Sequence, residues 1–190
     1  MSGADDPYVY PGTRTLRNRL GIVDPEKLER AERRLSVERG RQGVPSGSFD
    51  LAHLQAIHRH LFQDIYDWAG EIRTVEISKG AQQFQFRQYI QTGMADVHRR
   101  LVRSRFLSGL SRADFANQAA VILGDVNFVH PFREGNGRTQ LQYLKLLAVK
   151  AGHRLDLSRI DTKRWVEASR ISHAANDDLM AQLIAESIVE

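Results

Sequence analysis

The sequence predicts an all-α fold of seven or eight helices with one β-hairpin, and three observations support this prediction. Apolar residues recur at helical spacing through most of the 190-residue chain. Between residues 72 and 88 the spacing changes to alternation, which is typical of two short paired strands. No internal repeat and no long linker interrupts the helices, so we expect a single domain over residues 1–190.

Composition narrows the classes of function. Charged residues make up 26% and hydrophobic residues 42% of the chain, as in ordinary globular domains. The chain contains no run of about 18 apolar residues, so we expect no membrane-spanning helix. The absence of cysteine excludes a thiol nucleophile and fits a reducing compartment. The polar, acidic start does not resemble a signal peptide, and we therefore expect a cytoplasmic protein.

Basic residues cluster at residues 30–41 and 98–105, in a chain whose net charge is +4. Such clusters can bind nucleic acid. Acidic residues between positions 24 and 38 intersperse the first cluster, which is typical of a solvated helix face. We therefore expect no direct nucleic-acid binding. A DNA-binding module remains a weaker alternative, and a steep salt dependence of DNA affinity would reveal it.

The first part of the chain predicts an irregular arm followed by two helices. The arm covers residues 1–23 and is punctuated by prolines and glycines. Asp24-Pro25 supplies an N-cap and a first-turn proline for a helix that ends near Arg39. The apolar positions of this helix are Leu28, Ala31, Leu35 and Val37. Phe49-Asp50 begins a second helix, whose expected buried residues are Leu51, Leu54, Ile57, His58, Leu61 and Phe62.

A β-hairpin is predicted over residues 72–88. Val75-Glu76-Ile77 and Gln83–Phe86 alternate in polarity, and Ser78-Lys79-Gly80 is the expected turn between them. A hairpin this short is barely stable alone, so it lies on the helices or awaits a partner. Either arrangement leaves an edge that can add a strand from another chain.

Five further helices complete the prediction. Ser111 with Asp114 three residues later is an acceptable helix start. Residues 153–157 are expected to form a short extended link. The expected helices are Tyr89–Phe106, Ser111–Val129, a helix ending at Gly152, one beginning at Ser158 or Asp161, and one from about Asn176 to Ile188.

The stretch His130–Arg138 lies between two of these helices and forms a helix–loop–helix corner within residues 111–151. Its loop runs into a helix N-terminus, where unpaired N–H groups and a partial positive charge suit a phosphate. Gly135 and Gly137 let the backbone approach an anion closely. Arg138, in the first turn, can fork onto a phosphate.

Three more side chains of this stretch suggest roles. Glu134 is a carboxylate beside the predicted phosphate site and could hold Mg²⁺ together with phosphates and water. His130 could act as a general base near neutral pH. Phe132 alternates with the polar residues, and we expect it to anchor the loop in the core.

These residues, His-Pro-Phe-Arg-Glu-Gly-Asn-Gly-Arg, resemble the signature of the Fic family at every position. The resemblance implies an all-helical fold with a hairpin called the flap, and transfer of AMP from ATP to a protein hydroxyl. It implies that His130 deprotonates the target hydroxyl, that Glu134 binds Mg²⁺ and that Arg138 contacts a phosphate. It assigns the anion hole for the ATP phosphates to Gly135, Asn136 and Gly137.

Other segments carry the same resemblance, namely Asp67-Trp68-Ala69-Gly70 and Asp6-Pro7-Tyr8. Gly137, where the Doc branch has lysine, separates the chain from that phosphorylating branch. The flap is implied to hold an extended segment of the target protein over the active site. The flap residues are Val75, Glu76, Ile77, Ser78, Lys79 and Gly80.

The resemblance is closest to the short, toxin-like branch of the family. It implies a cytoplasmic toxin that modifies a Ser, Thr or Tyr hydroxyl, with the B-type subunits of DNA gyrase and topoisomerase IV as targets. The chain has no [S/T]-x-x-x-E-[G/N] inhibitory motif of its own. The resemblance therefore implies a separate small antitoxin chain that carries an inhibitory glutamate on a helix.

One position departs from the family pattern. Many members carry a second arginine three residues after Arg138, and this chain has Leu141 there. In the family that arginine orients the ATP γ-phosphate and pairs with the inhibitory glutamate. Leu141 also fits the core face of its predicted helix. Two alternatives therefore stay open: a transferase that uses another nucleotide or phosphate-containing donor, and a non-enzymatic interaction module with a vestigial site.

Overall fold

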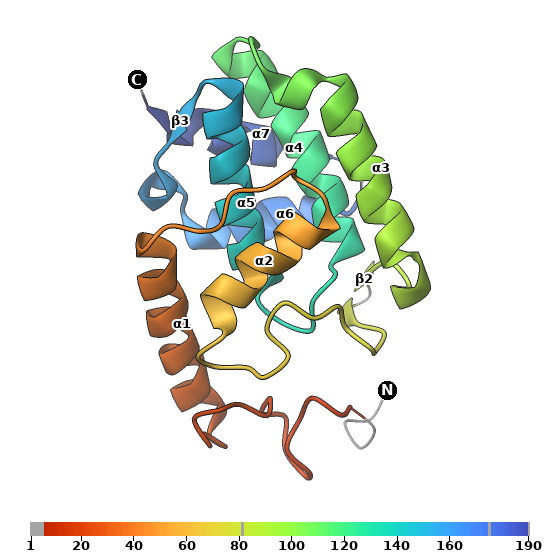
Figure 1. The fold of residues 1–190 in the computed structure, drawn as a ribbon, viewed down its shortest axis with the longest axis vertical. Helices are drawn as coiled ribbons and strands as arrows, with labels where there is room; N and C mark the ends of the chain where they lie inside the picture. Colours follow the sequence, from red (N-terminus) through yellow and green to blue (C-terminus); the bar gives the residue numbers. More distant parts are fainter. Residues whose placement is uncertain (1–5, 81, 175, 190) are drawn as a thin grey trace.

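The computed structural model describes residues 6–80, 82–174 and 176–189, and it confirms the predicted all-α fold with a hairpin (Figure 1). The helices are α1 (Pro25–Arg41), α2 (Leu51–Phe62), α3 (Ile90–Arg103), α4 (Arg112–Val129), α5 (Asn136–Ala151), α6 (Thr162–Ser172) and α7 (Asp178–Ser187). The strands are β1 (Ser78–Lys79), β2 (Gln82–Gln83), β3 (Arg154–Leu155) and β4 (Ile188–Val189). Short 3-10 turns cover Arg87–Tyr89 and Leu157–Arg159.

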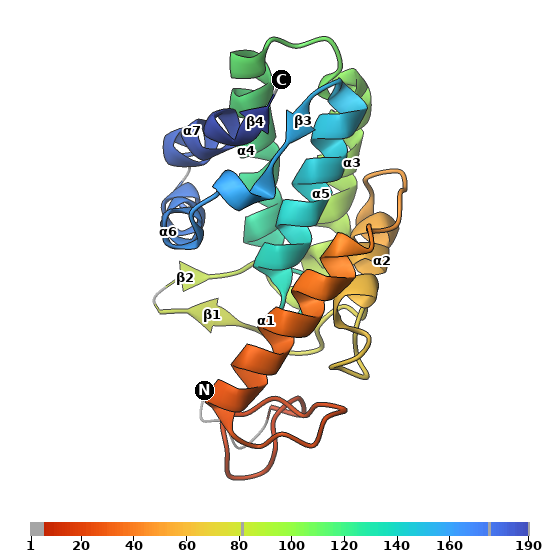
Figure 2. The same cartoon turned by 90° about the vertical axis from the view of Figure 1, so that its left-hand side faces the viewer.

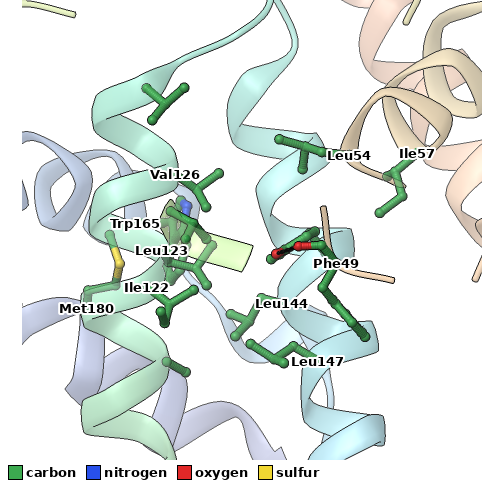
Figure 3. Close-up of a cluster of buried hydrophobic side chains, with 14 of the residues drawn as sticks. Phe49, Leu54, Ile57, Ile122, Leu123, Val126, Leu144, Leu147, Trp165 and Met180 are labelled. Atoms are coloured by element: carbon green, nitrogen blue, oxygen red, sulfur yellow. Dashed lines mark hydrogen bonds between the residues drawn. The ribbon is translucent and has the colours of Figure 1, made fainter. Parts of the chain in front are cut away.

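Helix α4 is the centre of the bundle. It packs against α3, α5 and α7, because its apolar residues face several directions around the helix. Figure 3 shows Leu123 and Val126 of α4 directed toward Leu144 and Leu147 of α5, and all four side chains are buried. Burial of side chains of this size contributes about 1.5–3 kcal/mol each. The corner between α4 and α5 is therefore anchored in the best-packed part of the molecule.

Side-chain caps fix where four of the helices begin. In each, the side chain of the capping residue accepts a hydrogen bond from a backbone N–H three residues later, at 2.8–3.1 Å. The capping residues are Asp24, Asp50, Ser111 and Asp161. A cap of this kind contributes about 1 kcal/mol. The predicted starts are confirmed, and Asp161 is the correct choice over Ser158.

The hairpin is shorter than predicted. β1 and β2 pair antiparallel, with Ser78 opposite Gln83 and Lys79 opposite Gln82. The prediction that Ser78 and Lys79 form the turn is therefore wrong. Before β1, the Ile77 carbonyl accepts from the Phe84 N–H at 3.3 Å, whereas the Val75 carbonyl accepts from the buried side chain of Arg73. Figure 2 shows the hairpin projecting from the bundle below α6.

Two other predicted boundaries are wrong. Helix α3 ends at Arg103, and the next turn, Arg105–Leu107, has φ between 52° and 61°. This left-handed turn buries Leu107 and places the Phe106 ring 5.7 Å from that of Phe49. At the C-terminal end, Ile188 belongs to β4, which pairs antiparallel with β3 and so draws the expected link into a two-stranded ribbon.

Helix α1 buries a face that differs from the predicted one. Its buried residues are Leu28, Glu32 and Ser36, at successive intervals of four, whereas Val37 is exposed. The two polar residues are buried because polar partners lie opposite them. The preceding arm is irregular from residue 6 to 23, as predicted, apart from one bridge between Val9 and Leu16. In the described part of the chain, no helix has the length and apolar character needed to span a membrane.

Candidate active site

His130 ends helix α4 and begins the loop of the corner. Its backbone N–H donates to the carbonyl of Val126 at 3.1 Å, and its φ of 46° is left-handed. This conformation is uncommon for a residue with a side chain and persists where surrounding contacts hold it. It turns the chain sharply, so that the loop leads from the end of α4 directly into the start of α5.

The hydrogen bonds of the His130 ring define its tautomer. Nδ1 lies 3.0 Å from the carbonyl oxygen of Asn127. A carbonyl only accepts, so Nδ1 carries the proton and donates. Nε2 therefore keeps its lone pair, which is the arrangement that a general base needs.

The surroundings of His130 favour its neutral form. Burial, with smaller electrostatic contributions from Arg73, Lys79 and His173, lowers the pKa of His130 to about 4, although the bond to Asn127 acts in the opposite direction. The ring of Phe84 stacks on the imidazole with centroids 3.7 Å apart. The imidazole is therefore neutral near pH 7 and able to accept a proton.

The loop is closed by its own asparagine. Oδ1 of Asn136 accepts from the backbone N–H of Phe132 at 3.0 Å, and Nδ2 donates to the Phe132 carbonyl at 2.8 Å. Asn136 and Phe132 are both buried, and the Phe132 ring stacks on that of His58 at 3.9 Å. The side chain of Asn136 is thus used inside the loop, which leaves its backbone N–H as the group available to an anion.

His58 supports the loop from helix α2. Its Nε2 donates to the carbonyl of Glu134 at 2.9 Å, and its Nδ1 accepts from the N–H of Gly70 at 2.8 Å. These two bonds require the neutral ring. Burial, with a smaller contribution from Arg138, lowers the pKa of His58 to about 4, although the bond to Glu134 acts in the opposite direction.

The start of α5 faces open space. Gly135 has φ of 82°, and a Cβ there would lie 2.5 Å from the Phe62 ring, so glycine is required on both grounds. A Cβ at Gly137 would meet nothing within 4 Å, which leaves room for a ligand at the helix N-terminus. The Glu134 side chain is 49% exposed, and its Oε1 accepts from the Gly135 N–H at 2.9 Å.

Arg138 lies beside this open end of α5, and its side chain is 33% exposed. Its guanidinium binds the carboxylate of Glu32 on α1 and donates to Oγ of Ser36 at 3.1 Å. It also lies 4.9 Å from the centre of the Phe62 ring and 3.9 Å from Oε1 of Glu134. The remaining N–H groups of Arg138 are the ones that could contact a phosphate.

Sequence analysis missed Arg73, which joins the hairpin to the His130–Arg138 corner. Its side chain is fully buried; Nε donates to the His130 carbonyl at 2.8 Å, and Nη1 donates to the Val75 carbonyl at 2.8 Å. Nη2 donates to the Gln85 carbonyl, and Nη1 approaches Glu76 at 3.3 Å. Both ends of the hairpin are thereby bound to the backbone of His130.

The N-terminal arm braces the same loop. Asp6 accepts from Nε and Nη2 of Arg133 at 2.9 and 2.7 Å. The Tyr8 hydroxyl accepts from the N–H of Thr74 at 3.1 Å, and the Tyr8 ring packs edge-on against Trp68. The arm segment singled out for its family resemblance therefore contacts both the corner loop and the segment before the hairpin.

The six predicted flap residues lie on the first arm of the hairpin and its tip. Val75, Glu76 and Ile77 are partly buried, whereas Ser78, Lys79 and Gly80 are exposed. On the other arm, Nε2 of Gln82 donates to the carbonyl of Arg170 on α6 at 2.9 Å. Glu76 accepts from the backbone N–H of Arg87 and so helps to close the base of the hairpin.

The structure also explains the first basic cluster and the leucine at position 141. Arginines of the first basic cluster pair with neighbouring carboxylates, for example Arg33 with Glu29 at 3.0 Å and Arg39 with Asp64 at 2.7 Å. This pairing supports the solvated-face interpretation. Leu141 is partly buried and packs against the hydrophobic core, so it supplies no polar group to the corner.

The buried polar residues that sequence analysis missed left weak signals. Glu32 lies four residues after Leu28 and four before Ser36, so the three residues share one face of α1. That spacing is the only feature of the sequence that associates Glu32 with the buried face. Arg73 is a single charged residue between the uncharged residues Ile72 and Thr74. Neither pattern identifies a partner, because each partner is distant in the sequence.

Comparisons with known proteins agree with this site. Residues 48–148 match the model of the Fic/DOC family. The probable protein adenylyltransferase y4lH of Sinorhizobium fredii is 39% identical over 186 residues, which cover 97% of this chain and 95% of that protein. The protein adenylyltransferase VbhT of Bartonella schoenbuchensis is 39% identical over 192 residues, which cover 99% of this chain and 40% of VbhT.

A solved structure shares the fold. The BepC protein of Bartonella tribocorum, determined with bound AMPPNP, matches with a TM-score of 0.85 at 29% identity, covering 96% of each chain. The predicted helical fold with a hairpin is thus confirmed by a structure as well as by the arrangement of the helices. The names of the relatives also agree with the class of enzyme that the motif predicted.

Proposed function

Because this chain belongs to the Fic/DOC family, we propose that it transfers AMP from ATP to a Ser, Thr or Tyr hydroxyl of another protein. The observation that carries the proposal is the unprotonated Nε2 of His130, one loop away from the N-terminus of α5 and its open space at Gly137. A proton acceptor and an anion-binding helix end lie on the same nine-residue corner. Attack of a hydroxyl on a phosphate uses both groups, because the hydroxyl must lose a proton and the phosphates need an anion-binding site.

The proposed reaction uses these groups as follows. The ATP phosphates would bind at the N-terminus of α5, against the backbone of Gly135–Gly137 and the side chain of Arg138, and the open space at Gly137 supports this placement. The target hydroxyl gives its proton to Nε2 of His130, and its oxygen bonds to the α-phosphorus. The bond from that phosphorus to the bridging oxygen breaks, and pyrophosphate leaves. General-base assistance contributes about 10²–10⁴-fold to such a step.

Glu134 fits the role of a single carboxylate ligand for Mg²⁺, with phosphates and water as the other ligands. Within residues 6–80, 82–174 and 176–189, no group of three or more His, Asp or Glu side chains could enclose a metal ion. Mg²⁺ is commonly held by one or two carboxylates together with phosphates and water. Half-exposed Glu134 beside the helix N-terminus meets that requirement, and a bound Mg²⁺ would neutralise charge on the phosphates.

The hairpin is the proposed docking site for the target segment. In the part of the chain that the structure describes, β1 pairs only with β2, so its outer edge can accept another extended strand. Arg73 binds both ends of the hairpin and the His130 carbonyl. A strand added at β1 would therefore be held at a defined position relative to His130, the proposed general base.

The test is to add the purified protein and Mg²⁺ to a bacterial lysate, with either α-³²P-ATP or γ-³²P-ATP, and to measure the label on the lysate proteins. We expect protein label from α-³²P only, and a loss of about 10²-fold or more in His130→Ala. The matched control is His60→Ala, since His60 lies on α2 with its ring against the Arg39 carbonyl. Label from γ-³²P would indicate a kinase reaction, and equal transfer by His130→Ala would contradict the mechanism.

Leu141 motivates the main alternative, a donor other than ATP. Without a second arginine, the site offers less positive charge to a γ-phosphate. Competition of other nucleotides against labelled ATP would identify such a donor. Binding of ATP with no transfer to any protein would instead favour an interaction module.

The finer proposals concern the target and its control. We propose the B-type subunits of DNA gyrase and topoisomerase IV as the first targets to test, on the family resemblance of the corner. The same resemblance supports a separate antitoxin that carries an inhibitory glutamate. Because Leu141 packs in the core, that glutamate would need a partner other than the second arginine. Labelling of the purified subunits, with and without the antitoxin, tests both proposals.

A further inference from the structure

Helix α1 places a buried carboxylate next to the proposed phosphate site. The Glu32 side chain is 8% exposed, and its two oxygens have different partners. One accepts from Nη2 of Arg138 and the other accepts from the hydroxyl of Tyr66. Burial and the nearby charge of Glu32 raise the pKa of Tyr66, so its hydroxyl stays protonated and acts as the donor.

The guanidinium of Arg138 is restrained on several sides. Nη1 donates to Oγ of Ser36 at 3.1 Å, and the plane of the group lies over the Phe62 ring, 4.9 Å from its centre. Arginine has five donors in a rigid fork, so these contacts leave the others aimed in fixed directions. Oε1 of Glu134 lies 3.9 Å from Nη2, and the Glu134 side chain is 49% exposed.

We propose that Glu32 is a positioning residue, whose buried carboxylate fixes the Arg138 guanidinium so that its free donors point at the transferred nucleotide's phosphates. This inference rests on the proposed function for the identity of the ligand. Glu32 itself touches no substrate and acts through Arg138. Position 141 is leucine and supplies no second arginine, so the orientation of Arg138 determines how the negative charge of the phosphates is neutralised at this end of the site.

The burial of the pair indicates that it persists when the nucleotide binds. Removing Arg138 from Glu32 would leave a buried carboxylate without its charged partner, which is strongly unfavourable. Tyr66 cannot move easily to compensate, since its ring is fully buried and stacks on Trp68 with centroids 4.2 Å apart. Arg138 therefore binds phosphate from a fixed place and does not swing away from α1.

Two conservative variants separate position from charge. Glu32→Gln keeps the reach of the side chain and removes the charge, whereas Glu32→Asp keeps the charge and shortens the reach by one methylene. A displacement of about 1 Å can lower a rate by up to about 10²-fold. We expect Glu32→Asp to lower kcat for AMP transfer by at least about 10-fold, and Glu32→Gln, which keeps an acceptor at the same reach, to lower kcat by less than Glu32→Asp does. The control is Glu29→Asp, on the exposed face of the same helix.

An Arg138→Ala background shows whether Glu32 acts through Arg138. The further loss caused by Glu32→Asp should vanish in that background, because a positioning effect requires the positioned group. If Glu32→Asp lowers kcat equally with and without Arg138, the role of Glu32 is structural and the proposal is wrong. If either Glu32 variant raises kcat, the pair restrains activity instead, and the proposal is also wrong.

A second readout does not depend on AMP transfer. The Nε–H signal of Arg138 in a ¹⁵N spectrum, assigned by its loss in Arg138→Lys, reports how firmly the guanidinium is held. We expect the signal in wild type and in Glu32→Gln, with and without Mg²⁺-ADP, and its loss in Glu32→Asp. If the signal behaves so in a protein that transfers no AMP, the proposed function fails and the positioning role stands. Transfer with an unchanged signal in Glu32→Asp would overturn the positioning role alone.

Discussion

Lowering the pH from 7 to 5 should destabilise the fold through the buried ring of His58. The ring accepts the Gly70 N–H at Nδ1 and donates from Nε2 to the Glu134 carbonyl. A protonated ring would present N–H on both nitrogens and lose the first bond. Acid should therefore weaken the contact between α2 and the His130–Arg138 corner as well as lower overall stability.

The size of the effect follows from the pKa shift. The pKa of His58 is about 4 in the folded protein, against 6.5 as the ordinary value. The unfolded chain therefore binds more protons between these two values, so stability is present above pH 6.5 and is lost as the pH falls toward 4. The loss attributable to His58 is about 2 kcal/mol at pH 5 and about 3 kcal/mol below pH 4.

The assay is urea unfolding followed by tryptophan fluorescence, at pH 7 and at pH 5, for wild type and His58→Gln. Glutamine keeps a donor for the Glu134 carbonyl and does not titrate. The other histidines, including His130, are common to both proteins, so their contributions cancel in the comparison. We expect wild type to lose about 2 kcal/mol more than His58→Gln between the two pH values. Equal losses in both proteins would refute the assignment of a neutral, buried His58.

Two further predictions concern stability at the corner. Arg73→Met removes the donor for four backbone carbonyls and should cost about 3 kcal/mol or more. Arg87→Met, which removes an exposed partner of Glu76, should change stability by less than about 0.5 kcal/mol. Equal melting temperatures for the two variants would contradict the role given to Arg73. Gly135→Ala places a Cβ against Phe62 at positive φ and should cost about 2 kcal/mol or more. Gly137→Ala has open space and should be neutral or stabilising by up to about 1 kcal/mol in urea unfolding, so a larger loss there than at Gly135 would show that the loop conformation is wrong.

Sequence reasoning succeeded where the cause of a feature is local. The cap at Asp50 and the glycine that ends α5 at Gly152 depend on residues within one helical turn. The corner His130–Arg138 is equally local, since its two glycines, its helix N-terminus and its arginine occur in one continuous stretch. The hairpin was found from its alternation, but its register was not, because the Val75 and Gln85 carbonyls near its base bind the side chain of Arg73, a contact that alternation does not indicate.

The helical class, the helix starts and the nine-residue corner can all be recognised in the amino-acid sequence. The residues that surround the corner depend on how the helices pack. Glu32 meets Arg138 across 106 positions of sequence, and Arg73 meets the His130 carbonyl across 57. A charge is buried only where a partner compensates for its lost hydration, and which partner that is depends on how the helices pack. Periodicity and motifs record the faces and ends of single helices, so these pairings could be seen only once α1, α2 and the hairpin were placed around α4 and α5.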